Sequence, residues 1–257
     1  MLRFPVCILA LVICKQVLAM SSTTFTAYGI TDQLNPEDTK YEEALKTAGE
    51  AFREADALFD DEAFVARRGW KKENVMSNGD SVYSKETRNG KMVTMSTSMD
   101  GNVDAVMRDI WTGIDSVPNW DPNIDFASKI VSLTNYSDVV TYGNSDVLIV
   151  SGREVVAARI YRPLPNGGYR MAFRSVAVDE KPETKDKVRA HLYLGAVQLR
   201  PHPENPNRTL YDVVTLFDLK GMLPKLIINQ FASRIMIMDT EIKVKHFKEI
   251  AEKAEKI

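Results

Sequence analysis

The spacing of apolar and polar positions changes along the chain, and its longest regular stretch lies near the C-terminus. Between residues 219 and 257, apolar side chains recur at steps of three and four, the spacing that keeps them on one face of a helix. Pro224 suits a first helical turn, where its missing N–H leaves no bond unmade, and no helix breaker follows before Ala254. The pattern predicts a C-terminal helix of about 30 residues, ~45 Å long. The members of its apolar face are Leu223, Ile227, Phe231, Ile235, Met238 and Ile242.

The apolar face of this helix is broad in its first half and diluted by charged residues in its second half. Two interpretations remain open. The helix either closes a solid core or covers a cavity. In the second case Met236 and Met238 would offer flexible, polarizable contacts to a ligand.

Two further helices are predicted in the first half of the chain. Asn35 and Pro36 are a capping residue and a first-turn proline, and the helical spacing that follows them continues to about Phe64. A shorter helix over residues 103–111 begins after the capping residue Asn102.

The remaining segments alternate with period two, which is typical of strands. Strands are predicted from Trp70 onward, with a tight hairpin turn at Asn89-Gly90, and then in the ranges 125–178, 188–199 and 209–219. The order of elements favours an α+β fold, with an antiparallel sheet that one long helix crosses.

Composition narrows the possible functions. The chain has 257 residues, 44% of them hydrophobic, and a net charge of −2, so nucleic-acid binding is disfavoured. No linker divides it, and we expect one domain over residues 36–255. Both cysteines, Cys7 and Cys14, lie in the first segment, and the three histidines lack paired spacing. We therefore expect neither a metal nor another cofactor.

Residues 1–19 have the layout of a secretory signal: Arg3, an apolar run, and small residues ending at Ala19. The run is too short to span a bilayer comfortably. Cleavage after Ala19 would yield a secreted protein, whereas translation from Met20 would yield a cytoplasmic one. In a secreted protein Asn135 and Asn207 would become glycosylation acceptors.

A series of short motifs carries a resemblance to a known family. The motifs are Trp120-Asp121-Pro122-Asn123, Gly152-Arg153-Glu154 with Arg159, Arg174-Ser175-Val176, Val188-Arg189-Ala190, Asp218-Leu219-Lys220-Gly221, Leu223-Pro224-Lys225 and Ile228-Asn229-Gln230. In the order and spacing of these motifs, from about Tyr41 to Ile250, the chain is similar to the START lipid-transfer family.

The resemblance implies a helix-grip fold, in which a curved antiparallel sheet wraps around the C-terminal helix and encloses a tunnel for one lipid. A phospholipid, a sterol or a sphingolipid would suit such a tunnel. We expect a monomeric carrier without enzymatic activity that contacts membranes transiently. The alternatives are a sensor or sequestering protein that does not transfer its lipid, and a lipid-ester hydrolase.

The resemblance also implies that Arg159 points into the cavity; the alternative is a surface arginine at a strand edge. The position that matches its carboxylate partner in the family holds Tyr136, and we expect Asp138 to point in another direction. Strand alternation places Tyr161 on the face of Arg159. His191 is either a polar anchor in the cavity or an ordinary sheet histidine. The candidate lipid contacts are Arg159, Tyr161, His191, Leu223, Ile227, Phe231, Ile235 and Met238.

A short apolar segment precedes Arg153 where the chain is longer than in related sequences of the family. It comprises Val147, Leu148, Ile149 and Val150. The resemblance places it at the tunnel mouth, where it could contact a membrane. Alternatively, it prolongs a buried strand.

Overall fold

The computed structural model describes residues 24–144, 152–221 and 225–254, and within the last range the side chains from residue 232 onward. The predicted signal at 1–19, the segment 147–150 and Leu223 lie outside the described residues.

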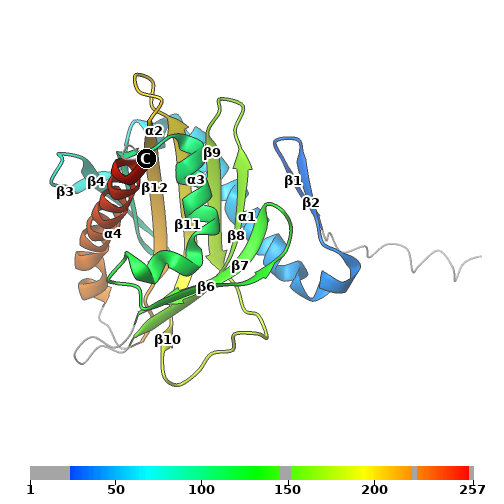
Figure 1. Cartoon of the computed structure of the whole chain (residues 1–257). Helices are drawn as coiled ribbons and strands as arrows, with labels where there is room; N and C mark the ends of the chain where they lie inside the picture. The colour runs from blue at the N-terminus through cyan, green and yellow to red at the C-terminus, as the bar shows by residue number, and fades with distance from the viewer. Residues whose placement is uncertain (1–23, 145–151, 222–224, 255–257) are drawn as a thin grey trace, which may run out of the picture.

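One large sheet dominates the molecule (Figure 1). Its strands run in the order β3-β4-β5-β12-β11-β9-β8-β7-β6, each antiparallel to its neighbours, and the short β10 pairs in parallel with β8. The strand bounds are β3 Lys71–Val75, β4 Ser81–Thr87, β5 Gly90–Asp100, β6 Phe126–Ser132, β7 Ser137–Gly143, β8 Arg153–Pro163, β9 Tyr169–Ser175, β10 Val188–Arg189, β11 His191–Pro201 and β12 Arg208–Asp218.

The hairpin between β4 and β5 is present, but its turn differs by one position from the prediction. Thr87 pairs with Gly90, so Arg88 and Asn89 form the two-residue turn rather than Asn89 and Gly90.

The helices confirm part of the prediction. The C-terminal helix α4 spans Lys225–Ala254, and α3 spans Val103–Thr112, where the Asn102 side chain accepts a hydrogen bond from the Ala105 amide. The single N-terminal helix predicted after Asn35 was wrong, because it is divided in three. The pieces are a 3₁₀ helix at Pro36–Tyr41, α1 at Glu42–Asp60 and α2 at Glu62–Val65. Asp61 causes the second break, since it is extended and caps α2 through the Ala63 amide.

The two faces of the sheet are covered by different helices (Figure 1). Helix α1 packs on the outer face, against β7, β8, β9 and β11, where small and aromatic side chains of α1 meet apolar residues of the strands in one cluster. On the inner face α4 packs along β3, β4 and β5, and α3 lies near β11 and β12. A second hydrophobic cluster lies on this inner side.

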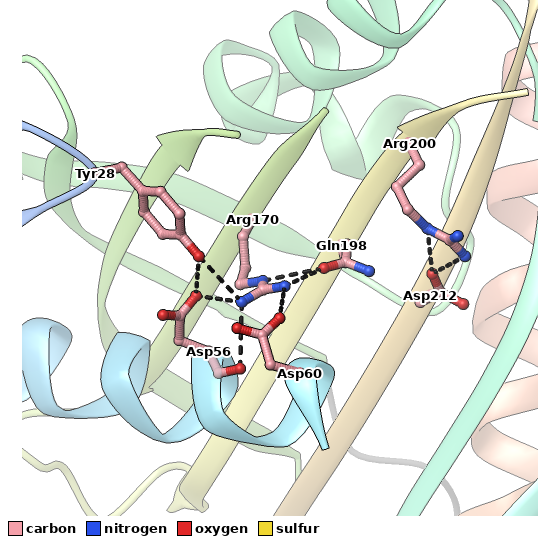
Figure 2. Close-up of polar contacts among 7 residues, drawn as sticks. All are labelled: Tyr28, Asp56, Asp60, Arg170, Gln198, Arg200 and Asp212. Carbon is pink, nitrogen blue, oxygen red and sulfur yellow. Dashed lines mark hydrogen bonds and ion pairs between the residues drawn. The ribbon is translucent and has the colours of Figure 1, made fainter. Parts of the chain in front are cut away.

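Figure 2 shows how a polar network fixes α1 on the outer face. The buried Arg170 of β9 pairs with Asp56 and Asp60 of α1 and donates to Gln198 of β11. The Asp56 carboxylate also accepts a 2.7 Å hydrogen bond from Tyr28. One buried guanidinium therefore joins the sheet, the helix and the N-terminal hairpin.

The N-terminal hairpin consists of β1 (Thr24–Ala27) and β2 (Ile30–Gln33), which precede the predicted domain start at residue 36. Asp32 of this hairpin forms an ion pair with Arg162 of β8, and both side chains are fully buried. Phe25 joins the outer hydrophobic cluster. Because a buried guanidinium needs its partner, the hairpin is an integral part of the folded unit.

Candidate functional site

A cavity of about 410 Å³ lies between the inner face of the sheet and the segments α3, α4 and the 3₁₀ helix Ile114–Asn119. Strand alternation builds its floor, because every second residue of a strand faces the same side. On β12 the inward residues are Tyr211, Val213, Thr215 and Phe217, and β7, β8, β9 and β11 add further side chains, most of them apolar. The space has the size and lining of a site for one small apolar molecule.

The floor of the cavity depends on one glycine. Phe173 of β9 pairs with Gly195 of β11, and a Cβ atom added at Gly195 would lie 2.1 Å from the Phe173 ring. The absence of a side chain at Gly195 therefore allows the aromatic ring to lie flat on the neighbouring strand.

Helix α4 covers the cavity with a face that is rotated from the predicted one. Its lining residues are Ala232, Ile235, Met236, Asp239, Lys243 and Phe247. Of the predicted contacts, Ile235 lines the cavity, whereas Met238 does not and is 45% exposed. Ile227 and Phe231 lie on α4, but their side chains are outside the described part. The predicted and observed faces differ because the inward face includes the charged residues Asp239 and Lys243, which a prediction based on the spacing of apolar residues omits.

Arg159 lines the cavity, and the expectation that Asp138 points elsewhere was wrong. Asp138 of β7 is the register partner of Arg159 of β8, so the two side chains share the inner face. They form a two-point ion pair, with Nε to Oδ1 at 2.8 Å and Nη2 to Oδ2 at 2.7 Å. The carboxylate partner was missed, although the hairpin register of the two strands would have indicated it.

Arg159 also fastens the end of α3. Its guanidinium donates to the carbonyl oxygen of Trp111 at 3.1 Å and approaches that of Ile110 at 3.4 Å. The carbonyls of a last helical turn have no partner within the helix, and a cation there is favourable. The Trp111 ring covers the guanidinium at 4.4 Å. Tyr161 shares the face of Arg159 but packs against Trp111, outside the cavity lining.

His191 does not face the cavity, contrary to one of the two predicted readings. Its neighbours Ala190 and Leu192 line the cavity, so His191 points to the opposite face, where its ring meets Tyr193 at 4.5 Å. Burial and the nearby Lys220 ammonium lower the pKa of His191. A bulge between Leu192 and Leu194 explains the error, since it shifts the alternation that continues through the rest of β11.

His246, in the C-terminal half of α4, contacts both Trp120 and α3 at the edge of the cavity. His246 stacks on Trp120 with ring centres 4.0 Å apart, and its Nε2 lies 3.0 Å from the Asp109 carboxylate of α3. Asp121, which follows Trp120, accepts a hydrogen bond from the Asn123 amide and so fixes the turn. Trp120 and Asp109 both line the cavity.

Within the described ranges, no group of three or more His, Cys, Asp and Glu side chains is arranged to hold a metal ion. None of the helices described there combines the length and apolarity needed to cross a bilayer.

The curved sheet, the helix α4 that packs along its inner face and the apolar cavity between them define an α+β protein of the helix-grip class. The family model described as "START domain" matches residues 50–253, so the chain belongs to the START domain family. A relative from Caenorhabditis elegans, "Steroidogenic acute regulatory-like protein 1", is 48% identical over 91% of this chain and 90% of its own length. The mitochondrial steroidogenic acute regulatory protein of Gallus gallus is 28% identical over 75% of this chain and 68% of its own length.

Two solved structures show the same fold. Human StAR-related lipid transfer protein 5 superposes with a TM-score of 0.71 at 20% identity, over 82% of this chain and 99% of that one. Human STARD10 superposes with a TM-score of 0.68 at 22% identity, over 80% of this chain and 81% of that one. The predicted family and fold class are therefore confirmed.

Proposed function

We propose that this protein binds one lipid molecule in the cavity beneath α4 and carries it between membranes. The observation that carries the proposal is the apolar space of about 410 Å³ between the sheet and α4. Each CH₂ group moved from water into such a space gains ~0.8 kcal/mol, so area alone can hold a hydrophobic molecule. Relatives named for lipid transfer and for steroidogenic regulation support a lipid as the ligand.

Closure of the cavity by α4 is part of this proposal. The inward residues Ile235 and Met236 would contact the lipid. Leu223, Ile227 and Phe231, nearer the start of the apolar stretch, would extend this cover. Release of the lipid would then require movement of α4 or of the segment 147–150, which we propose as the membrane contact.

We also propose that residues 1–19 direct export, with cleavage after Ala19. The alternative is translation from Met20 and a cytoplasmic protein. Both routes leave Met20 as the first residue. The location of the protein in its natural source therefore distinguishes them, because recovery from the extracellular fraction would support export and recovery from the cytosol would support translation from Met20.

A liposome assay tests the lipid-carrier proposal. Donor vesicles with a labelled lipid are mixed with unlabelled acceptors, and the protein should accelerate transfer. The double variant Val155→Phe/Thr215→Phe should reduce transfer at least several-fold, because both side chains line the cavity and the added rings occupy it. Val65→Phe is the matched control, since Val65 is 66% exposed on α2.

Equal transfer by the cavity-filled variant would contradict the proposal. Depletion of the donor vesicles without delivery to acceptors would instead indicate a protein that binds a lipid and does not transfer it.

A further inference from the structure

Helix α1 covers only part of the outer face of the sheet. It packs on β7, β8, β9 and β11, whereas β12, β5 and β4 continue the sheet beyond it. On the outer side of these strands, alternate positions carry polar side chains. The strand register places Ser96 opposite Asp212 and Asp100 opposite Arg208. This part of the sheet therefore presents a polar face on the side away from the cavity.

A row of hydrogen bonds crosses this polar face and joins two arginines. Arg67, which follows α2, donates to the Ser96 hydroxyl at 2.9 Å, and this hydroxyl donates to the Asp212 carboxylate at 2.6 Å. Asp212 pairs on its other side with Arg200 of β11 at 2.8 Å, as Figure 2 shows. The row therefore links β5, β12 and β11 on the outer face.

Two further cations extend the positive charge beyond this row. Arg208 of β12 donates to the Ser98 hydroxyl at 2.6 Å, and its Nε lies 3.4 Å from the Asp100 carboxylate. Lys72 of β3 is exposed and pairs in register with Tyr83 of β4. We call the four cations the outer basic patch: Arg67, Lys72, Arg200 and Arg208.

The charge of Arg67 is only partly compensated. Its side chain is half-buried, and within the described residues its hydrogen bonds go to two neutral oxygens, the Phe64 carbonyl and the Ser96 hydroxyl. Burial lowers the pKa of Arg67, and the nearby Asp212 carboxylate offsets this effect only in part. A carboxylate that approached Arg67 from outside would therefore stabilise its charged form.

The geometry of the patch favours separate carboxylates as its ligands. A guanidinium has five N–H donors in a planar fork that matches a carboxylate at two points. In the described structure Arg67 and Arg200 each use two of these donors. Both arginines therefore keep donors for a further carboxylate.

The same geometry disfavours a uniformly anionic surface such as a membrane. The four cations of the patch have two carboxylates among them, Asp100 and Asp212. A dense layer of lipid phosphates would meet these carboxylates as well as the cations, and like charges repel. A peptide can place its acidic side chains on the cations and avoid the two aspartates.

We propose that the outer basic patch is a docking surface for an acidic segment of a partner protein, whose Asp or Glu side chains pair with Arg67, Arg200 and Lys72. The cavity lies on the inner side of the sheet, so a docked partner leaves α4 and the cavity uncovered. The inference does not depend on which molecule the cavity binds.

The test measures how the full chain binds a fluorescently labelled oligoglutamate peptide, by anisotropy at low salt, where exposed ion pairs are least screened. The variant Arg67→Gln/Arg200→Gln should weaken binding at least about fivefold, because two charge-assisted contacts are lost. Lys245→Gln/Lys248→Gln is the matched control. It removes the same charge from exposed positions on α4 and should leave binding nearly unchanged.

A second variant tests the patch without breaking the row of hydrogen bonds. Lys72→Glu changes an exposed side chain and should weaken peptide binding at least about threefold. Urea unfolding of each variant checks that the fold is retained. Lys72→Glu therefore decides the question if the arginine variant is unstable.

Three results with the peptide would overturn the proposal: no binding by the unmodified chain, an equal loss in the lysine control, or undiminished binding in both patch variants. Vesicles of phosphatidylcholine and phosphatidylserine provide the comparison with a membrane. Tighter binding to these vesicles than to the peptide, lost in the same patch variants, would also overturn the proposal, because it would assign the patch to a membrane.

Discussion

Arg159 contributes to the structure through several contacts at once. It holds Asp138 on the neighbouring strand and the last carbonyls of α3, and the Trp111 ring shields it from solvent. Removing one partner of a buried ion pair leaves an uncompensated charge, which costs more than the pair contributes. Arg159 therefore keeps α3 in position beside the cavity.

We expect Asp138→Asn to lower the free energy of unfolding by about 3–5 kcal/mol, because Arg159 would stay buried without its carboxylate. Urea unfolding measures the loss. The control is Asp100→Asn, which breaks an exposed ion pair with Arg208 and should cost at most about 1 kcal/mol. A similar small loss for Asp138→Asn would show that water screens the Arg159 pair as well.

Glu154 makes stability depend on acid. Burial alone would raise the pKa of this carboxyl, but hydrogen bonds and charge from Arg189 and Lys181 outweigh burial and hold it below the ordinary 4.5. The native state thus favours the carboxylate. Its contribution is complete above the ordinary pKa and is lost as the pH falls towards the native one.

The destabilisation by Glu154→Gln should accordingly be largest at neutral pH and shrink at about pH 4 and below. Chemical denaturation at both pH values measures the difference. Glu62→Gln, at a side chain that is 95% exposed, should show no such dependence. If Glu154→Gln lowered the free energy of unfolding equally at both pH values, the charge of Glu154 would contribute nothing to stability and only its packing would matter.

Among the elements, the β9–β11 pair shapes the cavity floor through Gly195 and Phe173. We expect Gly195→Ala to push the Phe173 ring into the cavity and to cost about 1–3 kcal/mol of stability, as overpacking does. Lipid loading should fall together with the free energy of unfolding.

Adding Phe173→Leu to Gly195→Ala should restore part of the lipid loading and part of the free energy of unfolding, because the smaller leucine side chain leaves room for the new methyl group. Urea unfolding and the lipid bound per protein are the two measurements. Loading that is unchanged in the single variant would exclude Phe173 from the floor of the lipid site.

The spacing of apolar residues, together with capping and turn residues, predicted the long helices and most strands of the large sheet, because this spacing reports which face each element buries. It did not predict the N-terminal hairpin of β1 and β2. Predictions from residue spacing were wrong where a bulge or a capping residue interrupts the regular spacing. The bulge in β11 moved His191 to the outer face, and the capping side chain of Asp61 divided the predicted N-terminal helix. The site was harder to predict from the spacing of apolar residues. This spacing does not show that Asp138 pairs with Arg159 on the neighbouring strand. It also does not show that the inward face of α4 includes the charged residue Asp239.

At the scale of the whole molecule, the two faces of the sheet are packed differently. The outer face is filled by α1 and by buried ion pairs such as Arg162 with Asp32 and Arg170 with Asp56. The inner face is hollow beneath α4. The outer face beneath α1 is therefore closely packed, whereas part of the inner face beneath α4 is not, although a second hydrophobic cluster also lies on the inner side.

The hollow inner face has a mechanical consequence. Pressure favours states of smaller volume, and the volume lost on unfolding scales with the internal voids that disappear. A space of about 410 Å³ should therefore make the empty protein sensitive to compression. High-pressure fluorescence should show it unfolding at lower pressure than the lipid-loaded protein, with Val155→Phe/Thr215→Phe shifted towards the loaded form.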